Sequence, residues 1–386
     1  LTAQGTSVLA NHDPCPPLKF YKNNVDGKGA SYGSHENYQY SRDTNFEDIA
    51  QGLIPFFVTR QVVTGAGRMG LGADGEEAGF QISQRADYIE TEISLETTLN
   101  RGIINTRDEP HAVAEDYGRL HVIIGDATMS HTSTLLKLGM TALVLDAIED
   151  GVDFSDLRLA EPVAEVQRVS RDLTLTHELE LVDGRRLTAL DILAAYRERV
   201  TATSPAEEKV LDAWDEVVEL LAEDPLKAAH LLDWVAKYRL IKGYLDRGLA
   251  ADDPKLALID LQYTDIDPAK SLHHALVRKG QMRTLVSDDE LTRAADNPPN
   301  DTRAYLRGRA TQKFGDDVLA ASWQSLTFRI GPEDGAQSGA ASVALDETTK
   351  LGEGDVGAVL DSSATAAEFI DGLRQLGVTI EYPTLY

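Results

Sequence analysis

The sequence predicts an α+β fold, in which strands and helices are concentrated in different parts of the chain. Three observations support this prediction. Alternating polar and apolar residues dominate residues 18–125, amphipathic helical patterns dominate residues 126–250, and a smaller region with helices and one strand follows. A run of strands followed by a run of helices is typical of α+β proteins. We expect two domains, at residues 1–314 and 315–386.

Composition narrows the class of protein. The 386 residues include 37 Lys and Arg against 63 Asp and Glu, which gives a formal net charge of −26. Hydrophobic residues make up 42% of the chain and charged residues 26%, a balance typical of globular proteins rather than of disordered chains or membrane bundles. No apolar stretch approaches the ~20 residues of a membrane-spanning helix. The acidity disfavours nucleic acid as the main partner, because a phosphate backbone binds basic surfaces.

The single cysteine limits the redox and metal chemistry of the chain. With only Cys15 present, a disulfide framework within the chain and a cysteine-based zinc site are both excluded. One cysteine also fits a reducing cytoplasm, which is where we expect the protein. Leu1 is not an initiator methionine, and residues 1–17 resemble a helix end that runs into a proline-rich turn. We therefore expect the natural polypeptide to begin before Leu1.

The first region is expected to form strands, one helix and a loop. Alternating side chains predict strands at residues 31–40, 80–83, 88–93 and 119–124. Apolar residues with helical spacing predict a helix over residues 47–63. Residues 64–77 are polar and rich in glycine, but they lack the Lys-Ser/Thr ending of a phosphate-binding loop and follow a helix rather than a strand. We interpret them as a flexible turn.

The middle region is expected to be mostly helical. A broad apolar stripe predicts a helix over residues 128–150, with Asp126 or Ser130 as its N-cap. Further amphipathic helices are predicted at residues 189–200, 206–222 and 226–247. In the third region we expect a turn at 297–300, a helix at 301–314, a strand at 323–330, a loop at 331–357 and a helix at 363–376.

Two histidines on predicted strands are candidates for a functional site. Side-chain alternation places His35 and Asn37 on one face of their strand, and it places Arg119 and His121 on the polar face of a later strand. An imidazole nitrogen can bind a divalent ion while a neighbouring guanidinium binds phosphate oxygens. Magnesium prefers oxygen ligands, so carboxylates would be needed beside the histidines. For each histidine, hydrogen bonding within a sheet remains the alternative.

Two charged segments offer weaker candidates. Residues 101–111 contain two arginines, two acids and a histidine, so Arg107 is either an anion-binding residue or part of a solvated turn. Glu90 and Glu92 share one strand face, where they are either paired carboxylates for metal or acid–base chemistry or an exposed acidic surface. No nucleophilic cysteine is supported, so chemistry based on carboxylates or on a metal ion remains.

Long ordered runs of residues occur along nearly the whole chain. They are residues 21–38, 57–65, 103–111 (which include Asn-Thr-Arg-Asp-Glu-Pro-His), 119–126, 260–263 and 297–299, followed by Trp323. Together these runs resemble the family of Pup ligases and Pup deamidases, enzymes that act on the small protein modifier Pup. Residues 94–104 and 30–34 resemble the deamidase and depupylase branch of this family more than the ligase branch.

The resemblance implies a fold and an activity. The fold is glutamine-synthetase-like, with a curved antiparallel sheet that holds ATP and Mg²⁺, helices behind it and a small C-terminal domain. The activity is hydrolysis at the C-terminal side-chain amide of Pup, which deamidates its terminal Gln and removes Pup from substrate lysines with nucleotide required. An ATP-dependent Pup–protein ligase is the alternative. The implied partners are Pup and pupylated proteins of the proteasome pathway.

The resemblance also implies roles for the residues of the two strands. By position, His35 and His121 resemble the two histidines that assist metal binding in the family. Asn37 and Arg119, each on the same face as one histidine, are the expected nucleotide partners. The catalytic Asp of the family and its paired Glu metal ligands would precede Leu1, so the resemblance assigns no catalytic residue within this chain.

Three further implications concern anions, adenine and Pup. Arg107 resembles an anion-binding arginine, and Trp323 resembles a tryptophan that packs near the adenine, with core packing as the alternative. Because Pup is acidic in this family, its groove is expected to be locally basic, with solvated surface charge as the alternative. The basic residues considered for this groove are Arg239, Lys242, Arg247, Arg278, Lys279 and Arg283.

Overall fold

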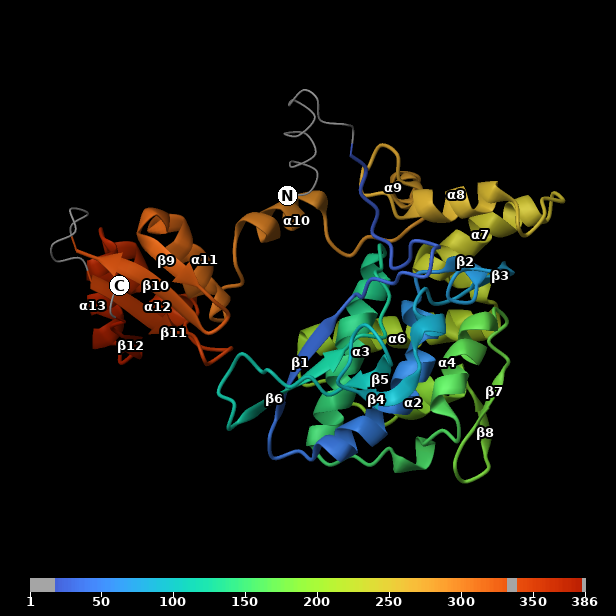
Figure 1. Cartoon of the computed structure of the whole chain (residues 1–386), viewed down its shortest axis with the longest axis horizontal. Coiled ribbons are helices and arrows are strands. Elements are labelled where there is room, and N and C mark those ends of the chain that lie inside the picture. Colours follow the sequence, from blue (N-terminus) through green and yellow to red (C-terminus); the bar gives the residue numbers. More distant parts are fainter. Residues whose placement is uncertain (1–17, 332–338, 384–386) are drawn as a thin grey trace. The chain divides into compact units, whose positions relative to one another are not determined.

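The computed structural model describes residues 18–331 and 339–383 (Figure 1). The chain falls into a larger compact unit, residues 1–108 with 119–285, and a smaller one, residues 109–118 with 286–386. These units are defined by compactness and not by independent folding, so the predicted domain boundary at residue 314 stays a prediction. The predictions for residues 1–17, Cys15 among them, lie outside the described residues. Within the described parts, every helix is too short or too polar to cross a membrane.

A four-stranded sheet carries the candidate site in the larger unit. Its strands are β1 (Glu36–Ser41), β4 (Thr91–Ser94), β5 (Gly102–Asn105) and β6 (Tyr117–Val122), in the order β1-β6-β5-β4. β5 is antiparallel to β6 but parallel to β4, so the sheet is mixed rather than antiparallel throughout. Glu36 and Tyr40 are buried while Asn37 and Gln39 are exposed, which confirms the predicted alternation along β1.

Eight helices of the larger unit surround or extend this sheet in the described part of the chain. They are α2 (Phe46–Thr64), α3 (His131–Glu149), α4 (Pro162–Arg171), α5 (Ala189–Arg197), α6 (Pro205–Glu223), α7 (Asp233–Leu245), α8 (Pro254–Tyr263) and α9 (Leu272–Arg278). The predicted helices over 47–63, 128–150, 189–200 and 206–222 are present, and the α+β class is confirmed.

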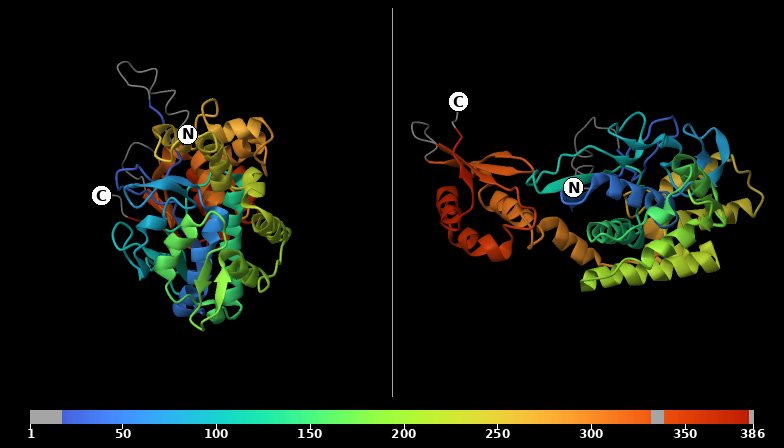
Figure 2. Two further views of the ribbon diagram at one scale, coloured as in Figure 1. Left: turned by 90° about the vertical axis from the view of Figure 1, so that its right-hand side faces the viewer. Right: turned by 90° about the horizontal axis from the view of Figure 1, so that it is seen from below.

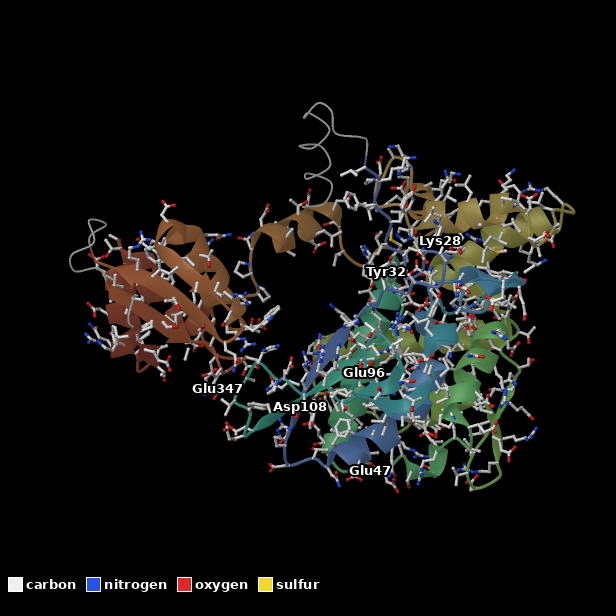
Figure 3. All side chains as sticks on the ribbon, viewed as in Figure 1. Lys28, Tyr32, Glu47, Glu96, Asp108 and Glu347 are labelled. Atoms are coloured by element: carbon white, nitrogen blue, oxygen red, sulfur yellow. The ribbon has the colours of Figure 1, made fainter. Side chains whose placement is uncertain are left out.

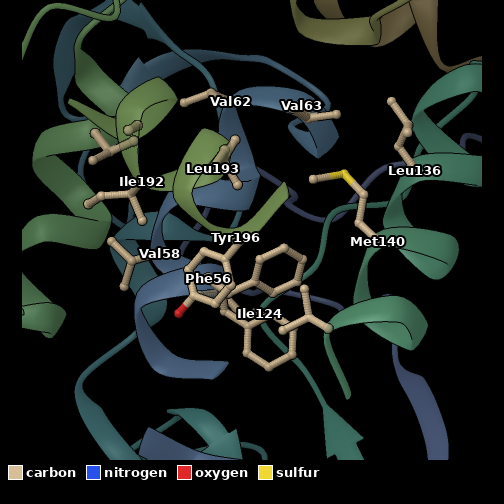
Figure 4. Packing of buried hydrophobic residues seen from close by; sticks show 14 of the residues in the cluster. Phe56, Val58, Val62, Val63, Ile124, Leu136, Met140, Ile192, Leu193 and Tyr196 are labelled. Carbon is tan, nitrogen blue, oxygen red and sulfur yellow. The ribbon is translucent and has the colours of Figure 1, made fainter. Parts of the chain in front are cut away.

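Helix α2 forms the centre of the larger unit. Nearly all of its side chains from residue 49 to residue 64 are buried, and it packs against α3, α4 and α5 (Figures 1 and 2). Phe56 of α2 meets the ring of Tyr196 edge-on, with 5.3 Å between the ring centroids (Figure 4). The Tyr196 hydroxyl donates a 2.6 Å hydrogen bond to the carbonyl oxygen of Gly52, so its only polar atom is satisfied within the core.

Several local predictions for the larger unit were wrong. The turn predicted over 64–77 contains β2 (Arg68–Leu71), which pairs with β3 (Glu77–Gln81). The helix predicted over 226–247 is divided into a 3-10 turn at 225–230 and α7. The two are separate because Asp233, at the start of α7, is buried and accepts hydrogen bonds from the backbone N–H groups of Met129 and Ser130. In the region expected to be mostly helical, β7 (Glu178–Glu180) and β8 (Arg186–Thr188) form a hairpin, whose three-residue strands are too short to show alternation.

The smaller unit has its own sheet and hydrophobic core. Its elements are α10 (Asp288–Asp296), α11 (Ala304–Lys313), β9 (Val318–Ala321), β10 (Ser325–Ile330), β11 (Gly339–Ala344), α12 (Glu353–Ser362), α13 (Ala366–Gln375) and β12 (Ile380–Glu381). The strands form an antiparallel sheet in the order β12-β11-β10-β9. The rings of Phe314, Phe328 and Phe369 pack together within this core.

Predictions for the smaller unit were partly correct. β10 and α13 confirm the strand predicted at 323–330 and the helix predicted at 363–376. The loop predicted at 331–357 was wrong, because β11 and the start of α12 lie within it. β11 consists of Gly, Ala, Ser and a single Val, residues that lack the β-branched and aromatic enrichment by which strands are recognised.

Asp233 joins several helices of the larger unit at one buried point. Its carboxylate accepts hydrogen bonds from the backbone N–H groups of Met129 and Ser130, at 2.8 and 3.0 Å, just before α3 begins. The hydroxyl of Tyr263 in α8 donates to the same carboxylate at 2.8 Å. His273 of α9 packs edge-on against the Tyr263 ring and is 4% exposed. The ends of four helices therefore depend on one polar cluster.

The buried His273 predicts that the protein loses stability in mild acid. Burial lowers the pKa of this imidazole from 6.5 to about 4, against the opposing effect of Asp233. Between these two pH values the unfolded chain binds more protons than the folded chain, so the free energy of unfolding falls as the pH falls from about 6.5 towards 4. Urea unfolding at pH 7, 6 and 5 measures this slope, and H273Q is expected to reduce it. Equal stability of the wild type at pH 5 and pH 7 would contradict the prediction.

Candidate functional site

A buried ion pair holds the strand that follows the first histidine. Two nitrogens of Arg60 in α2 donate to the two carboxylate oxygens of Glu36, at 2.8 and 2.9 Å, and both side chains are at most 2% exposed. Arg60 also donates to the carbonyl oxygen of Lys137 and the hydroxyl of Thr141 in α3. Because Glu36 follows His35 directly, this ion pair fixes the backbone that carries the histidine.

The structure brings the two predicted histidines into direct contact. Nε2 of His121 lies 3.0 Å from Nδ1 of His35, and the ring centroids are 4.9 Å apart. Residues so distant in the sequence meet because β1 and β6 are neighbours in the sheet. On the other side of the His121 ring, Nδ1 lies 3.1 Å from Oδ1 of Asn105, the residue opposite it on β5. The expected proximity is present, whereas metal binding by this pair stays a prediction.

Three arginines give the histidine pair a positive environment. Burial lowers the pKa of His35, and the guanidinium groups of three neighbours lower it further. These neighbours are Arg85, Arg107 and Arg119. Burial, followed by the effects of His35 and two of the arginines, lowers the pKa of His121 to about 4. Both imidazoles are therefore neutral near pH 7, and in a chain of net charge −26 this local positive charge favours an anionic ligand such as a phosphate.

Arg85 is a residue of this site that the sequence analysis missed. Its side chain is 1% exposed, and it donates to the Ser31 hydroxyl at 2.5 Å and to the carbonyl oxygen of Ile123 at 3.1 Å. Among the described residues its Nε has no hydrogen-bond partner and no carboxylate forms an ion pair with it. Burial and the charge of Arg101 lower its pKa to about 10. The buried carboxylate of Asp126 opposes this shift from beyond ion-pair distance, so the guanidinium is only partly compensated, and a bound anion would offset part of the free-energy cost of its burial.

Arg107 and Arg119 are connected through the segment between β5 and β6. Arg119 donates to the carbonyl oxygen of Arg107 at 3.1 Å, and its backbone N–H donates to Asp108 at 3.0 Å. Asp108, labelled in Figure 3, also accepts a 2.6 Å hydrogen bond from Arg42. The guanidinium of Arg107 is exposed and makes no hydrogen bond or ion pair within the described part of the chain, so it is available to an anion.

The other two predicted nucleotide contacts lie on exposed surfaces. Asn37 is exposed on β1, on the alternating face that its sequence position predicts. Trp323 belongs to the smaller unit and is 62% exposed, with the Arg307 guanidinium 5.1 Å from its ring and the His111 ring 5.9 Å away. This exposure rules out core packing as the role of Trp323. Its contact with adenine stays a prediction.

The described residues do not complete a magnesium site by themselves. His35 and His121 offer nitrogen atoms, whereas the adjacent carboxylate of Glu36 is buried against Arg60. Residues 18–331 and 339–383 contain no group of three or more His, Cys, Asp or Glu side chains that could hold a metal ion. The exposed Glu90 and Glu92, two positions apart in the chain, therefore do not form such a group with other side chains in this part of the structure. Magnesium prefers oxygen ligands, so the donor set present does not fit this ion.

The basic residues considered for a docking groove are in part engaged locally. Arg283 donates to both carboxylate oxygens of Glu216, at 2.6 and 2.7 Å. Lys242 pairs with Asp246 one helical turn away, at 2.7 Å. These contacts favour the solvated-surface alternative for the two basic residues. The location of a basic groove stays a prediction.

Comparisons with known proteins place the chain among enzymes that act on Pup. Residues 2–327 match the family described as "Pup-ligase protein". The chain is 51% identical over 363 residues to a Pup deamidase/depupylase of Mycolicibacterium smegmatis, which covers 92% of this chain and 72% of the relative. A depupylase of Acidothermus cellulolyticus is 49% identical over 366 residues, with the same coverage. A Pup–protein ligase of Nakamurella multipartita is 43% identical over 337 residues, covering 84% of this chain and 74% of the ligase.

Solved structures show the same relationship at the level of the fold. The Pup ligase PafA in complex with ADP matches 97% of this chain and 80% of its own, with a TM-score of 0.79 and 33% identity. The complex between Pup and PafA matches with the same TM-score and identity, covering 97% of this chain and 74% of the ligase chain. The glutamine-synthetase-like architecture expected from the sequence is therefore confirmed.

Proposed function

This chain belongs to the Pup-ligase family, and from that premise we propose that it is a Pup deamidase and depupylase. It converts the C-terminal Gln of Pup to Glu and hydrolyses the isopeptide bond between Pup and a substrate lysine. One observation supports the choice within the family. The chain is 49–51% identical to the deamidase/depupylase of Mycolicibacterium smegmatis and the depupylase of Acidothermus cellulolyticus over 92% of its length, but 43% identical to the ligase of Nakamurella multipartita over 84%. Its partners are accordingly Pup and pupylated proteins.

The reaction requires stabilisation of negative charge. When water or a carboxylate attacks the amide carbon, the carbonyl oxygen becomes an oxyanion, and the leaving nitrogen takes up a proton. Preorganised cations beside this oxygen lower the barrier, because they need not reorganise as the charge develops. Arg85, Arg107 and Arg119 supply positive charge beside the histidine pair. We assign this stabilising role to the arginines, and the catalytic Asp implied by the family stays a prediction.

Nucleotide binding follows from the same charge distribution. ADP is bound by the ligase PafA, whose fold this chain shares with a TM-score of 0.79. A chain of net charge −26 binds polyphosphate only where basic side chains gather locally, and the surroundings of His35 and His121 meet that requirement. We propose ATP as the nucleotide, with phosphates on the arginines, Asn37 beside them and Trp323 at the adenine. We also propose that Mg²⁺ accompanies the phosphates, whose oxygens supply the ligands that the described side chains lack, and that His35 and His121 assist its binding from beside the phosphates.

The function is tested by mass spectrometry of Pup that ends in glutamine. The purified protein is incubated with this Pup and ATP, with a second sample that lacks nucleotide. A gain of about one dalton in Pup mass with ATP, and none without it, is expected for amide hydrolysis. An unchanged mass would count against the deamidase. Pup–lysine conjugates formed together with ADP release would instead support the ligase.

A further inference from the structure

Asn105 occupies a central position behind the histidine pair. It is the last residue of β5, its side chain is fully buried, and it lies directly opposite His121 in the sheet. Its Nδ2 donates a 3.0 Å hydrogen bond to the carbonyl oxygen of Glu96, in the loop between β4 and β5. Its Oδ1 accepts from the backbone N–H of Arg107 at 3.0 Å. The same Oδ1 lies 3.1 Å from Nδ1 of His121.

These contacts fix the orientation of the Asn105 amide. A carbonyl oxygen only accepts hydrogen bonds, so the amide NH₂ must face Glu96. A backbone N–H only donates, so the amide oxygen must face Arg107. The hydrogen bonds of Nδ2 and of Oδ1 therefore require the same orientation of the Asn105 amide. Because Oδ1 also faces His121 and cannot donate, Nδ1 of His121 must carry a proton.

The orientation of Asn105 determines the protons on both histidines. A neutral imidazole carries one N–H, so His121 with its proton on Nδ1 has a lone pair on Nε2. This lone pair faces Nδ1 of His35 at 3.0 Å, which must therefore be the donor. The remaining nitrogen of His35, Nε2, is then an acceptor. Nε2 of His35 lies beside Gly33, where an added Cβ would be 2.3 Å from it, so any other residue at position 33 would have to displace the ring.

We propose that Asn105 is a positioning residue that fixes the tautomers of His121 and His35, so that Nε2 of His35 is the atom offered to a ligand. The lone pair of this nitrogen accepts a hydrogen bond from a donor in the site or coordinates a cation. Outer contacts of this kind set the tautomer and orientation of functional histidines in many sites. The expected effect of Asn105 on the rate of Pup hydrolysis rests on the proposed function. The tautomers of the two histidines follow from the hydrogen bonds alone and do not depend on that function.

The tautomers are measured by long-range ¹H–¹⁵N NMR of the ¹⁵N-histidine-labelled protein near pH 7, with H35Q and H121Q to assign the signals. In the wild type we expect a proton on Nδ1 and none on Nε2 for both residues. N105L removes the acceptor and is expected to give a mixture of tautomers. N105D retains an acceptor for His121 and should keep the wild-type pattern. N297L, in which an exposed side-chain bond to Arg293 is lost, is the matched control and should change nothing.

Kinetics separate positioning from simple structural support. With Pup ending in glutamine, N105L is expected to lower kcat about tenfold or more with little change in KM, and N105D to recover most of the loss. A wild-type spectrum with the His121 proton on Nε2 would overturn the proposal whatever the activity. Unchanged tautomers in N105L would overturn it as well. If the tautomers behave as expected but no hydrolysis occurs in the wild type, the failure lies with the proposed function.

Discussion

Replacing Glu36 by alanine is expected to lower the free energy of unfolding by about 3–5 kcal/mol, the usual cost of leaving one partner of a buried ion pair uncompensated. The Arg60 guanidinium would remain buried in the core without the carboxylate that now accepts two of its hydrogen bonds. Tyr38, whose hydroxyl donates to Glu36 at 2.6 Å, would lose that acceptor and keep only the longer contact with the carbonyl oxygen of Lys137, at 3.3 Å. Urea unfolding at pH 7 measures the loss.

An exposed pair of the same geometry provides the control. Arg283 binds Glu216 through two hydrogen bonds, but the side chains are 38% and 39% exposed. Because solvent screens this pair and can hydrate the remaining charge, E216A is expected to cost less than about 1 kcal/mol. Similar losses for E36A and E216A would show that burial does not decide the strength of these pairs. It would also remove the argument that Arg60 anchors the strand beside His35.

Replacing Arg85 by methionine is expected to weaken ADP binding about 100-fold while leaving stability unchanged or higher. A charge-assisted hydrogen bond to phosphate from Nε, the guanidinium nitrogen without a partner, is worth about 1.5–3 kcal/mol, and the upper end of this range corresponds to a loss of this size. Stability should not fall, because methionine fills similar volume and removes a buried charge that Asp126 compensates only from beyond ion-pair distance. Calorimetric titration with ADP and urea unfolding measure the two quantities. A substitution that weakens ligand binding but raises stability indicates a residue that is retained for function rather than for the fold.

Arg68 is the matched control for this prediction. It is as buried as Arg85, at 2% exposure, but it lies 3.5 Å from the carboxylate of Asp87. R68M therefore removes the buried one of the two arginines that pair with Asp87, the other being the half-exposed Arg171 at 2.8 Å, and is expected to destabilise the protein with little effect on ADP affinity. If R85M destabilised the protein as R68M does and kept its ADP affinity, Arg85 would be a structural residue. The phosphate assignment would then fail.

The sequence predicted some elements of the fold correctly and missed others. Alternation along β1 was correctly predicted, because its inward and outward faces differ sharply in polarity. β11 was missed because small residues give no alternating signal, and the β7–β8 hairpin because three-residue strands are below what periodicity can detect. The break before α7 was missed because it depends on Asp233 reaching backbone groups of residues 129 and 130, about 100 positions away.

By itself, the sequence determined the α+β class, the family through long ordered runs, and the identity of the two histidines with their strand faces. Only the tertiary structure decided that the rings touch, that Asn105 orients one of them, and that Arg85 is buried with its Nε unpartnered among the described residues. The reason is physical: side-chain alternation is a property of neighbouring residues, whereas burial and ring contact depend on which distant segments pack together. An arginine in solvent and an arginine in a core are written with the same letter, and they differ only in what surrounds them.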